Sequence, residues 1–313
     1  MRALVIGPNG QDGTLIRDRI NVIKNQVYGL TRNALLNFSG NRIIEIEKRA
    51  RSDSSDLNSI LEHLKPDLIF HMAAIHGSSN SMQSEIHRNK NEMLELHVGY
   101  TKSILEWQLN HPSSKSFFAL SSQMYSYSAS EQSINEDTEF SPQNFYGETK
   151  VIALELIREC RSTSKVNASG LILFNHASEY NNKKFLFPII AQQLSLILQG
   201  ATNQLSLRNP LASIEMTSAR EIVDAIMLIS ELGESGDFVL AQGVSYKIER
   251  IIQEVCKILN LPGIDIESIN TPIIEPCLVG DITKAKKVLD WAPSQKPWEV
   301  LKDMTIKTSN INP

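Results

Sequence analysis

The chain has 313 residues, of which 42% are hydrophobic and 21% are charged. This balance is typical of a globular protein with one large or two moderate domains, and it excludes a disordered chain. The formal net charge of -4 lacks the positive excess that binding to nucleic acid or to an anionic membrane requires, so we expect neither partner.

Short apolar runs alternate with longer helical patterns along the first half of the chain. The runs predicted as buried strands are residues 3–6, 27–30, 68–70, 117–120 and 171–174. The patterns predicted as helices are residues 14–24, 57–64, 92–109 and 146–161. This alternation predicts an α/β fold with a Rossmann-type, doubly wound parallel sheet covered on both faces.

The second half has a looser rhythm and predicts a smaller α/β cap. Helices are predicted at residues 188–199, 219–232, 247–259 and 282–289, with a short strand at 238–241. We expect a first domain of residues 1–174 and a C-terminal cap of residues 175–313, with parts of 218–242 returning to the first domain.

The cysteines and the opening residues bear on the compartment. Cys160, Cys256 and Cys277 are far apart and show neither CxxC nor Cys/His spacing, so we expect reduced thiols, no disulfide and no metal site. The chain opens on the strand-like run MRALVIG and contains no uninterrupted run of about 18 apolar residues. We therefore expect a soluble cytoplasmic protein without a membrane partner.

A glycine-rich segment, VIGPNGQDGT, follows the first predicted strand and precedes a predicted helix. It places Gly7, Gly10 and Gly13 at three-residue spacing, with Gln11 and Asp12 between the last two. Such glycines allow a tight turn and a close approach of the backbone to a diphosphate at the helix N-terminus. The strand-loop-helix context favours a dinucleotide-binding loop over a turn without a ligand.

A second indicator lies at the end of the second predicted strand, where an acidic residue would bind the ribose hydroxyls of NAD. The sequence there is Leu30-Thr31-Arg32-Asn33, with a cation and no acid. An arginine suits a 2′-phosphate, so NADP(H) is favoured over NAD(H). A solvated surface arginine is the alternative interpretation.

The segment FYGETK places Tyr146 and Lys150 four residues apart, on one face at the start of a predicted helix. Tyrosine has an unperturbed pKa of about 10, and we expect the nearby ammonium group to lower the pKa of Tyr146 and make the pair a proton-transfer device. Ser121 ends the preceding strand, at the edge where open parallel sheets bind their ligands. These three residues are the predicted catalytic residues.

The motifs extend almost from end to end of the chain. They are GPNGQDGT (7–14), SDSSDL (52–57), KPDLIFHMAA (65–74), ALSSQMYS (119–126), FYGETK (145–150), ILFNHAS (172–178) and GDITKAKKVLDW (280–291). On these motifs the chain resembles the extended short-chain dehydrogenase/reductases, the NAD-dependent epimerase/dehydratase family, and within it the GDP-mannose 4,6-dehydratases. The resemblance implies a nucleotide-sugar enzyme, with a dinucleotide-binding first domain, a substrate-binding cap and assembly into a homodimer or homotetramer.

The resemblance also implies roles for individual residues. Tyr146 would exchange the proton of a sugar hydroxyl at carbon 4 while a hydride passes to or from the nicotinamide. Ser121 would hydrogen-bond the same sugar oxygen, and Lys150 would hold the nicotinamide ribose. The cofactor-binding candidates are Gly7, Gly10, Gln11, Asp12, Gly13, Arg32, Asp53, Ala73, Ala74, Tyr146 and Lys150. The substrate-binding candidates are Gln123, Asn175 and His76.

Several positions depart from the pattern of the dehydratases. Gln123 occupies the place of a glutamate that removes the carbon 5 proton, and an amide cannot act as that base. Two arginines that grip the nucleotide diphosphate in the family fall on Ile214 and Thr271. The acidic residue expected at the adenine falls on Ala50, unless Asp53 takes its place.

Three functions are compatible with the sequence. The first is an NADP-dependent oxidoreductase or epimerase acting at carbon 4 of a nucleotide-linked sugar, such as a 4-keto-6-deoxy-sugar reductase. The second is a 4,6-dehydratase in which Glu131 or another carboxylate replaces Gln123 as the base. The third is a non-catalytic dinucleotide-binding scaffold, which the missing arginines favour and the retained pair of Tyr146 and Lys150 opposes.

Overall fold

The chain forms two compact units. The computed structural model describes residues 1–21, 26–39, 42–48, 53–75, 90–126, 133–233, 235–261, 263–269 and 277–309. The first unit comprises Met1–Ser126, Glu136–Leu173 and Val223–Phe238, and the second comprises Tyr127–Asn135, Phe174–Ile222 and Val239–Pro313. The predicted roles of a dinucleotide-binding domain and a substrate-binding cap stay predictions.

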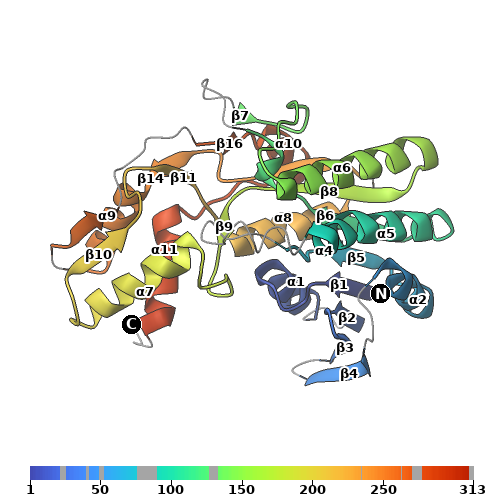
Figure 1. The fold of residues 1–313 in the computed structure, drawn as a ribbon, viewed down its shortest axis with the longest axis horizontal. Coiled ribbons are helices and arrows are strands. Elements are labelled where there is room, and N and C mark those ends of the chain that lie inside the picture. The colour runs from blue at the N-terminus through green and yellow to red at the C-terminus, as the bar shows by residue number, and fades with distance from the viewer. Residues whose placement is uncertain are drawn as a thin grey trace. The chain divides into compact units, whose positions relative to one another are not determined.

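The main sheet has eight strands in the order β13-β8-β6-β5-β1-β2-β3-β4, and Figure 1 shows the strands from β5 to β4 side by side in this order. Their bounds are β1 Arg2–Ile6, β2 Gln26–Leu30, β3 Ala34–Ser39, β4 Arg42–Lys48, β5 Leu68–His71, β6 Lys115–Ala119, β8 Asn167–Leu173 and β13 Asp237–Leu240. The five strands from β8 to β2 in this order pair in parallel. This arrangement confirms the predicted Rossmann-like α/β class.

The strands β3 and β4 are a difference from the purely parallel sheet that was predicted. Both pair antiparallel, β3 with β2 and β4 with β3. A tight turn explains the reversal: the Thr31 hydroxyl accepts from the backbone N–H of Ala34 at 2.9 Å, and the Thr31 N–H donates to the Ala34 carbonyl at 2.9 Å. The chain therefore returns along β2 instead of crossing the sheet through a helix.

Helices connect the parallel strands of the first unit. Their bounds are α1 Gln11–Asn21, α2 Ser54–Leu64, α4 Lys90–Leu94, α5 Tyr100–Leu109 and α6 Phe145–Ser164, with a π-helical segment η1 at Glu95–Gly99 and a 3₁₀ turn η2 at Ser122–Met124. The continuous helix predicted over residues 92–109 is thus interrupted by a π-helical segment. Apolar residues of α2, α5 and α6 form one core with those of β1, β5 and β6, because strands buried on both faces need helices to cover them.

The second unit is built around the helices α7 (Leu186–Leu198), α9 (Ile248–Ile258) and α11 (Pro297–Ser309), which share one apolar core. The sequence did not predict α11. The helix α10 (Thr283–Leu289) also belongs to this unit, whereas most of α8 (Ala219–Glu231) belongs to the first unit. Four two-stranded sheets pair β9 (His176–Ala177) with β12 (Thr217–Ser218), β10 (Gln204–Leu207) with β15 (Asp265–Ser268), β11 (Ser213–Glu215) with β14 (Ser245–Lys247), and β7 (Ser133–Ile134) with β16 (Val279–Gly280).

The described residues show neither a membrane-spanning helix nor a metal-binding cluster. Within these ranges, no helix combines the length and the apolar character needed to cross a membrane. The same part of the chain holds no group of three or more His, Cys, Asp or Glu side chains arranged to bind a metal ion. The three cysteines are free thiols.

Candidate active site

The glycine turn joins β1 to α1 in the first unit. Gly7 has a φ of +85°, a left-handed conformation that L side chains rarely adopt, and a Cβ there would lie 2.8 Å from the Cα of Ala73. A Cβ on Gly13 would collide with the Gly7 carbonyl oxygen. The backbone N–H of Gly10 donates to that same carbonyl at 3.2 Å, and α1 begins at the next residue, Gln11. The sequence therefore builds a tight turn against β5 that ends in a helix N-terminus, as predicted for an anion-binding loop.

A cavity of about 470 Å³ opens at the carboxyl ends of β1, β2 and β5. Its walls include Gly7, Arg32, Ala73, Ala74 and Glu92, all in the first unit. Four cofactor-binding candidates thus line one cavity at the edge of the sheet where parallel folds bind ligands. The guanidinium Nη2 of Arg32 lies 3.0 Å from a carboxylate oxygen of Glu92, a partner that the sequence did not indicate.

Ser121 and Tyr146 meet at the carboxyl end of β6. Ser121 caps the 3₁₀ turn η2, Tyr146 lies in the first turn of α6, and the two side chains are close enough for Ser121 to influence the pKa of the phenol. Burial raises the pKa of Tyr146 to about 12, the interaction with Ser121 lowers it in part, and the charge of Asp12 raises it. The direction is opposite to the one predicted from Lys150, because burial is the largest cause of the shift and Lys150 is not among its causes. Tyr146 is therefore a protonated phenol at neutral pH.

Lys150 is buried one helical turn after Tyr146. Its side chain is only 3% exposed, and Nζ donates to the Ala119 carbonyl at the end of β6 at 2.7 Å. The same Nζ lies 5.6 Å from the centre of the Tyr146 ring. Burial lowers the pKa of Lys150 to about 7, so this amine exchanges its proton near neutral pH. The three predicted catalytic residues are thus gathered in one place, although their catalytic role stays a prediction.

Gln123 lies in the 3₁₀ turn η2 and contacts the start of α6. Asn144 donates from Nδ2 to the Gln123 Oε1 at 3.0 Å, and Asn144 also caps α6 by accepting the Gly147 N–H at 2.9 Å. A Cβ on Gly147 would collide with the Gln123 carbonyl oxygen, so η2 packs closely on the first turn of α6. The Gln123 side chain is exposed and carries a neutral amide, and its backbone N–H donates to the Ser121 hydroxyl oxygen at 3.2 Å.

His97 is a residue of this site that sequence reasoning missed. Its Nε2 accepts the Ile75 N–H at 3.2 Å, so the proton must be on Nδ1, which lies 2.8 Å from the Thr149 hydroxyl oxygen. The Thr149 hydroxyl donates a hydrogen bond to the Tyr146 backbone carbonyl at 2.8 Å. The buried His97 ring also packs edge-on against the Tyr146 ring, with centres 5.3 Å apart. Only the fold reveals this link between the cavity wall and α6, because the partners are far apart in the sequence.

His71 and Asp53 have structural partners. Burial and then the charge of Lys150 lower the pKa of His71 to about 3, and its Nε2 donates to the Leu96 carbonyl at 2.8 Å. Asp53 caps α2 by accepting the Asp56 N–H at 3.1 Å. A helix cap needs no ligand, so the proposed contact of Asp53 with adenine stays a prediction.

The second unit contains Asn175 and the position of the first missing arginine. Asn175 is exposed directly before β9, and its carbonyl accepts the Thr217 N–H at 2.9 Å. Ile214, where the resemblance places the first missing arginine, packs against the apolar core of this unit. The next residue, Glu215, is fully buried and accepts the backbone N–H groups of Gly243 at 2.6 Å and Gly280 at 3.0 Å.

Some predicted residues lie outside the described ranges. These are Ala50, His76, Glu131 and Thr271. Their predicted roles stay predictions.

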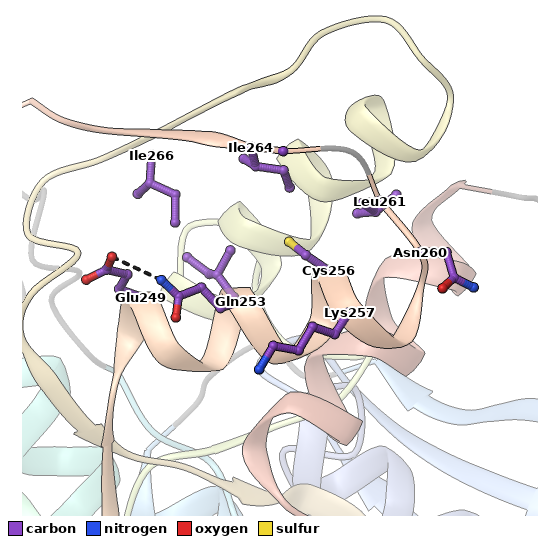
Figure 2. A pocket seen from close by; sticks show the side chains of 10 residues that line it. Glu249, Gln253, Cys256, Lys257, Asn260, Leu261, Ile264 and Ile266 are labelled. Carbon is purple, nitrogen blue, oxygen red and sulfur yellow. Dashed lines mark hydrogen bonds between the residues drawn. The ribbon is translucent and has the colours of Figure 1, made fainter.

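A second cavity, of about 700 Å³, lies in the second unit between α9 and the segment that leads into β15. Figure 2 shows the Cys256 side chain on the side of α9 that faces Leu261 and Ile264, with Gln253 hydrogen-bonded to Glu249. Burial raises the pKa of the Cys256 thiol to about 11, which makes it a poor nucleophile at neutral pH. No predicted site residue is among those that line this cavity.

Comparisons with known proteins agree with the sequence resemblance. A family model described as GDP-mannose 4,6 dehydratase matches residues 4–304. A GDP-mannose 4,6-dehydratase of Vibrio cholerae is 25% identical over 99% of this chain and 94% of its own length. GDP-mannose 4,6 dehydratase 2 of Arabidopsis thaliana is 27% identical over 93% of this chain and 82% of its own length. The solved structure of RMD from Pseudomonas aeruginosa complexed with NADPH superposes with a TM-score of 0.79 at 18% identity, covering 99% of each chain.

Proposed function

The chain belongs to the GDP-mannose 4,6 dehydratase family, and we propose that it is a nicotinamide-dependent enzyme that transfers a hydride and a proton at carbon 4 of a nucleotide-linked sugar. The observation that carries this proposal is the placement of Ser121 and Tyr146 together beside the buried Lys150. A pure binding module has no need of such a proton-transfer group. The sugar-nucleotide class of substrate is supported by the names of the matched relatives.

The residues of the first unit fit a dinucleotide. The left-handed Gly7 and the close approach of the glycine turn to Ala73 leave backbone rather than side chains facing the start of α1, which suits a diphosphate. Arg32, in the wall of the adjacent cavity, suits a 2′-phosphate, so NADP(H) is proposed ahead of NAD(H). The bound nicotinamide supplies or accepts the hydride.

Tyr146 supplies the proton. Because burial raises its pKa to about 12, the phenol is protonated at neutral pH and is suited to protonate the oxygen of a 4-keto sugar while carbon 4 receives the hydride. Ser121 hydrogen-bonds the same oxygen, and the electron pair of the carbonyl bond becomes the new O–H bond. Lys150, whose pKa of about 7 lets it exchange protons near neutrality, returns a proton to the phenolate.

Gln123 favours a reaction that stops at carbon 4. Elimination of water across carbons 5 and 6 needs a base for the carbon 5 proton, and the Gln123 amide, held by Asn144, has none to offer. This favours a 4-keto-sugar reductase or a 4-epimerase.

A 4,6-dehydratase is the second candidate, and the names of the matched relatives favour it. It begins with the same transfer at carbon 4 and would need another carboxylate as the base. A non-catalytic dinucleotide-binding scaffold remains the outcome to which a lack of any turnover would point.

Mass spectrometry of two incubations tests the proposal. The protein is mixed with GDP-mannose and NADP, and separately with a GDP-linked 4-keto-6-deoxy sugar and NADPH. Gain of two hydrogens on the keto sugar, lost in Tyr146→Phe, supports the reductase, whereas loss of one water from GDP-mannose supports the dehydratase. Gln123→Glu keeps the acceptor for Asn144 and restores a carboxylate, so we expect it to introduce water loss if only the base is missing.

A further inference from the structure

The wall of the 470 Å³ cavity contains one ion pair, between Arg32 after β2 and Glu92 in α4. Nη2 of Arg32 lies 3.0 Å from a carboxylate oxygen of Glu92, and the two side chains are 64% and 55% exposed. An exposed pair of this kind contributes little to the stability of the fold. Arg32 can therefore exchange Glu92 for another anionic partner at little cost in stability. The Arg32 guanidinium, to which the proposed function assigns the 2′-phosphate, is thus already paired with the Glu92 carboxylate.

The neighbouring polar groups of this wall have other partners. Glu95, which also lines the cavity, accepts the Ser54 N–H at the start of α2 at 2.6 Å. The Thr31 hydroxyl is bonded within its own turn, to the carbonyl and the N–H of Ala34. Glu92 is thus the carboxylate that the structure directs at Arg32.

Glu92 weakens the binding of a phosphate to Arg32 in two ways. The guanidinium offers charge-assisted, bidentate hydrogen bonds that a carboxylate and a phosphate both accept, so the two anions compete for one cation. Even after Arg32 has changed partner, the charge of Glu92 remains within a few ångströms and repels the phosphate. A cofactor without the 2′-phosphate meets neither effect.

We propose that Glu92 is a specificity-determining residue of the cofactor cavity: by competing for Arg32, it lowers the preference for NADP(H) over NAD(H) that Arg32 alone would give. The inference rests on the proposed function, in that it takes the cavity to hold the dinucleotide. It assigns the balance between the two cofactors to a pair of side chains rather than to the arginine by itself.

Calorimetric titration of NADPH and NADH into the intact chain tests this inference without any substrate. In Glu92→Gln, we expect the ratio of the Kd for NADH to the Kd for NADPH to rise about fivefold, mainly through tighter NADPH binding. Arg32→Gln should bring the ratio close to one. In the double variant, Glu92→Gln should have a much smaller effect, because the cation for which Glu92 competes has gone and only its direct repulsion of the phosphate remains.

Glu106→Gln is the matched control. Glu106 pairs with Lys102 on α5 at 3.7 Å, with side chains 57% and 64% exposed, and it does not line the cavity. It removes the same charge from an equally exposed ion pair of the same unit, so we expect the cofactor ratio to stay unchanged.

Three results would overturn the inference: an unchanged ratio in Glu92→Gln, an equal change in both Kd values, or a Glu92→Gln effect of undiminished size without Arg32. Each of these leaves the proposed function intact as long as the unmodified chain binds a dinucleotide. Binding of neither NADPH nor NADH by the unmodified chain would instead overturn both proposals.

Discussion

Two buried ionisable groups, one in each unit, show the same physical effect in different settings. Burial lowers the pKa of Lys150 in the first unit from 10.5 to about 7 and raises the pKa of Glu215 in the second unit from 4.5 to about 7. Lys150 lies beside Tyr146, whose pKa Ser121 influences, whereas Glu215 accepts backbone N–H groups from two other segments of its unit. A strongly shifted pKa alone therefore does not identify an active site, and its neighbours decide its use.

The largest expected effect is a loss of activity at the site of the first unit, around Tyr146 and Lys150. Tyr146→Phe should lower kcat about a thousandfold, because it removes the proton that the transfer needs, while the free energy of unfolding changes little. Tyr125→Phe is the control, since its buried hydroxyl has no hydrogen-bond partner in the described part of the chain. Paired measurements of turnover and of urea unfolding check this, and a Tyr146→Phe variant with full activity would contradict the proposed role.

Glu215 should show the converse pattern. Glu215→Ala leaves the buried N–H groups of Gly243 and Gly280 without an acceptor, so we expect the free energy of unfolding to fall by about 3 kcal/mol. Glu215→Gln keeps one acceptor oxygen and should cost roughly half as much. Urea unfolding measures both, and equal stability of the three proteins would show that the carboxylate does not hold these segments together.

The two groups also predict opposite dependences of stability on pH. Because the folded pKa of Glu215 is raised, its contribution is fully present below about pH 4.5 and is lost as the pH rises to about 7. Because the folded pKa of Lys150 is lowered, its contribution is fully present above about pH 10.5 and is lost as the pH falls to about 7.

Denaturation of the wild type, Glu215→Gln and Lys150→Met between about pH 4.5 and 10.5 checks the direction of each dependence. The difference in unfolding free energy between the wild type and Glu215→Gln should change below neutral pH. The difference between the wild type and Lys150→Met should change above it. A difference that is flat with pH for either variant would show that the corresponding group is not shifted.

The smallest expected effect concerns His97 as a positioning residue. His97→Phe keeps an aromatic ring against Tyr146 but removes the hydrogen bonds to Ile75 and Thr149, and we expect kcat to fall about tenfold with KM nearly unchanged. His97→Gln, which retains a donor and an acceptor, should recover part of the loss. A parallel loss of stability and activity in both variants would indicate a structural role alone.

Local pattern predicted much of the fold. Parallel strands buried on both faces read as apolar runs, and the strands around β1, β5 and β6 were predicted for that reason. The hairpin of β3 and β4 was missed although the alternation of Ile44, Glu45 and Ile46 is a strand signal in the sequence. The π-helical segment η1 could not be predicted, because the apolar period runs through it.

The candidate site was predicted where its residues belong to known motifs and missed where they meet only through folding. Ser121, Tyr146 and Lys150 were found from motif order and lie together. The partners of Arg32 and His97 come from segments far away in the sequence, and no local pattern connects them. The direction of the Tyr146 pKa shift was wrong for a related reason, since burial is a property of the whole packed site.

Isotope transfer is the most direct test of the central claim that a hydride and a proton pass at carbon 4 with Tyr146 as the proton donor. The protein is incubated with a GDP-linked 4-keto-6-deoxy sugar and NADPH that carries deuterium on the transferred position, and the sugar is analysed by NMR and mass spectrometry. We predict one deuterium at carbon 4 with the wild type and none with Tyr146→Phe. Binding of NADPH and of the sugar without any deuterium in the sugar, or equal transfer by Tyr146→Phe, would contradict the account.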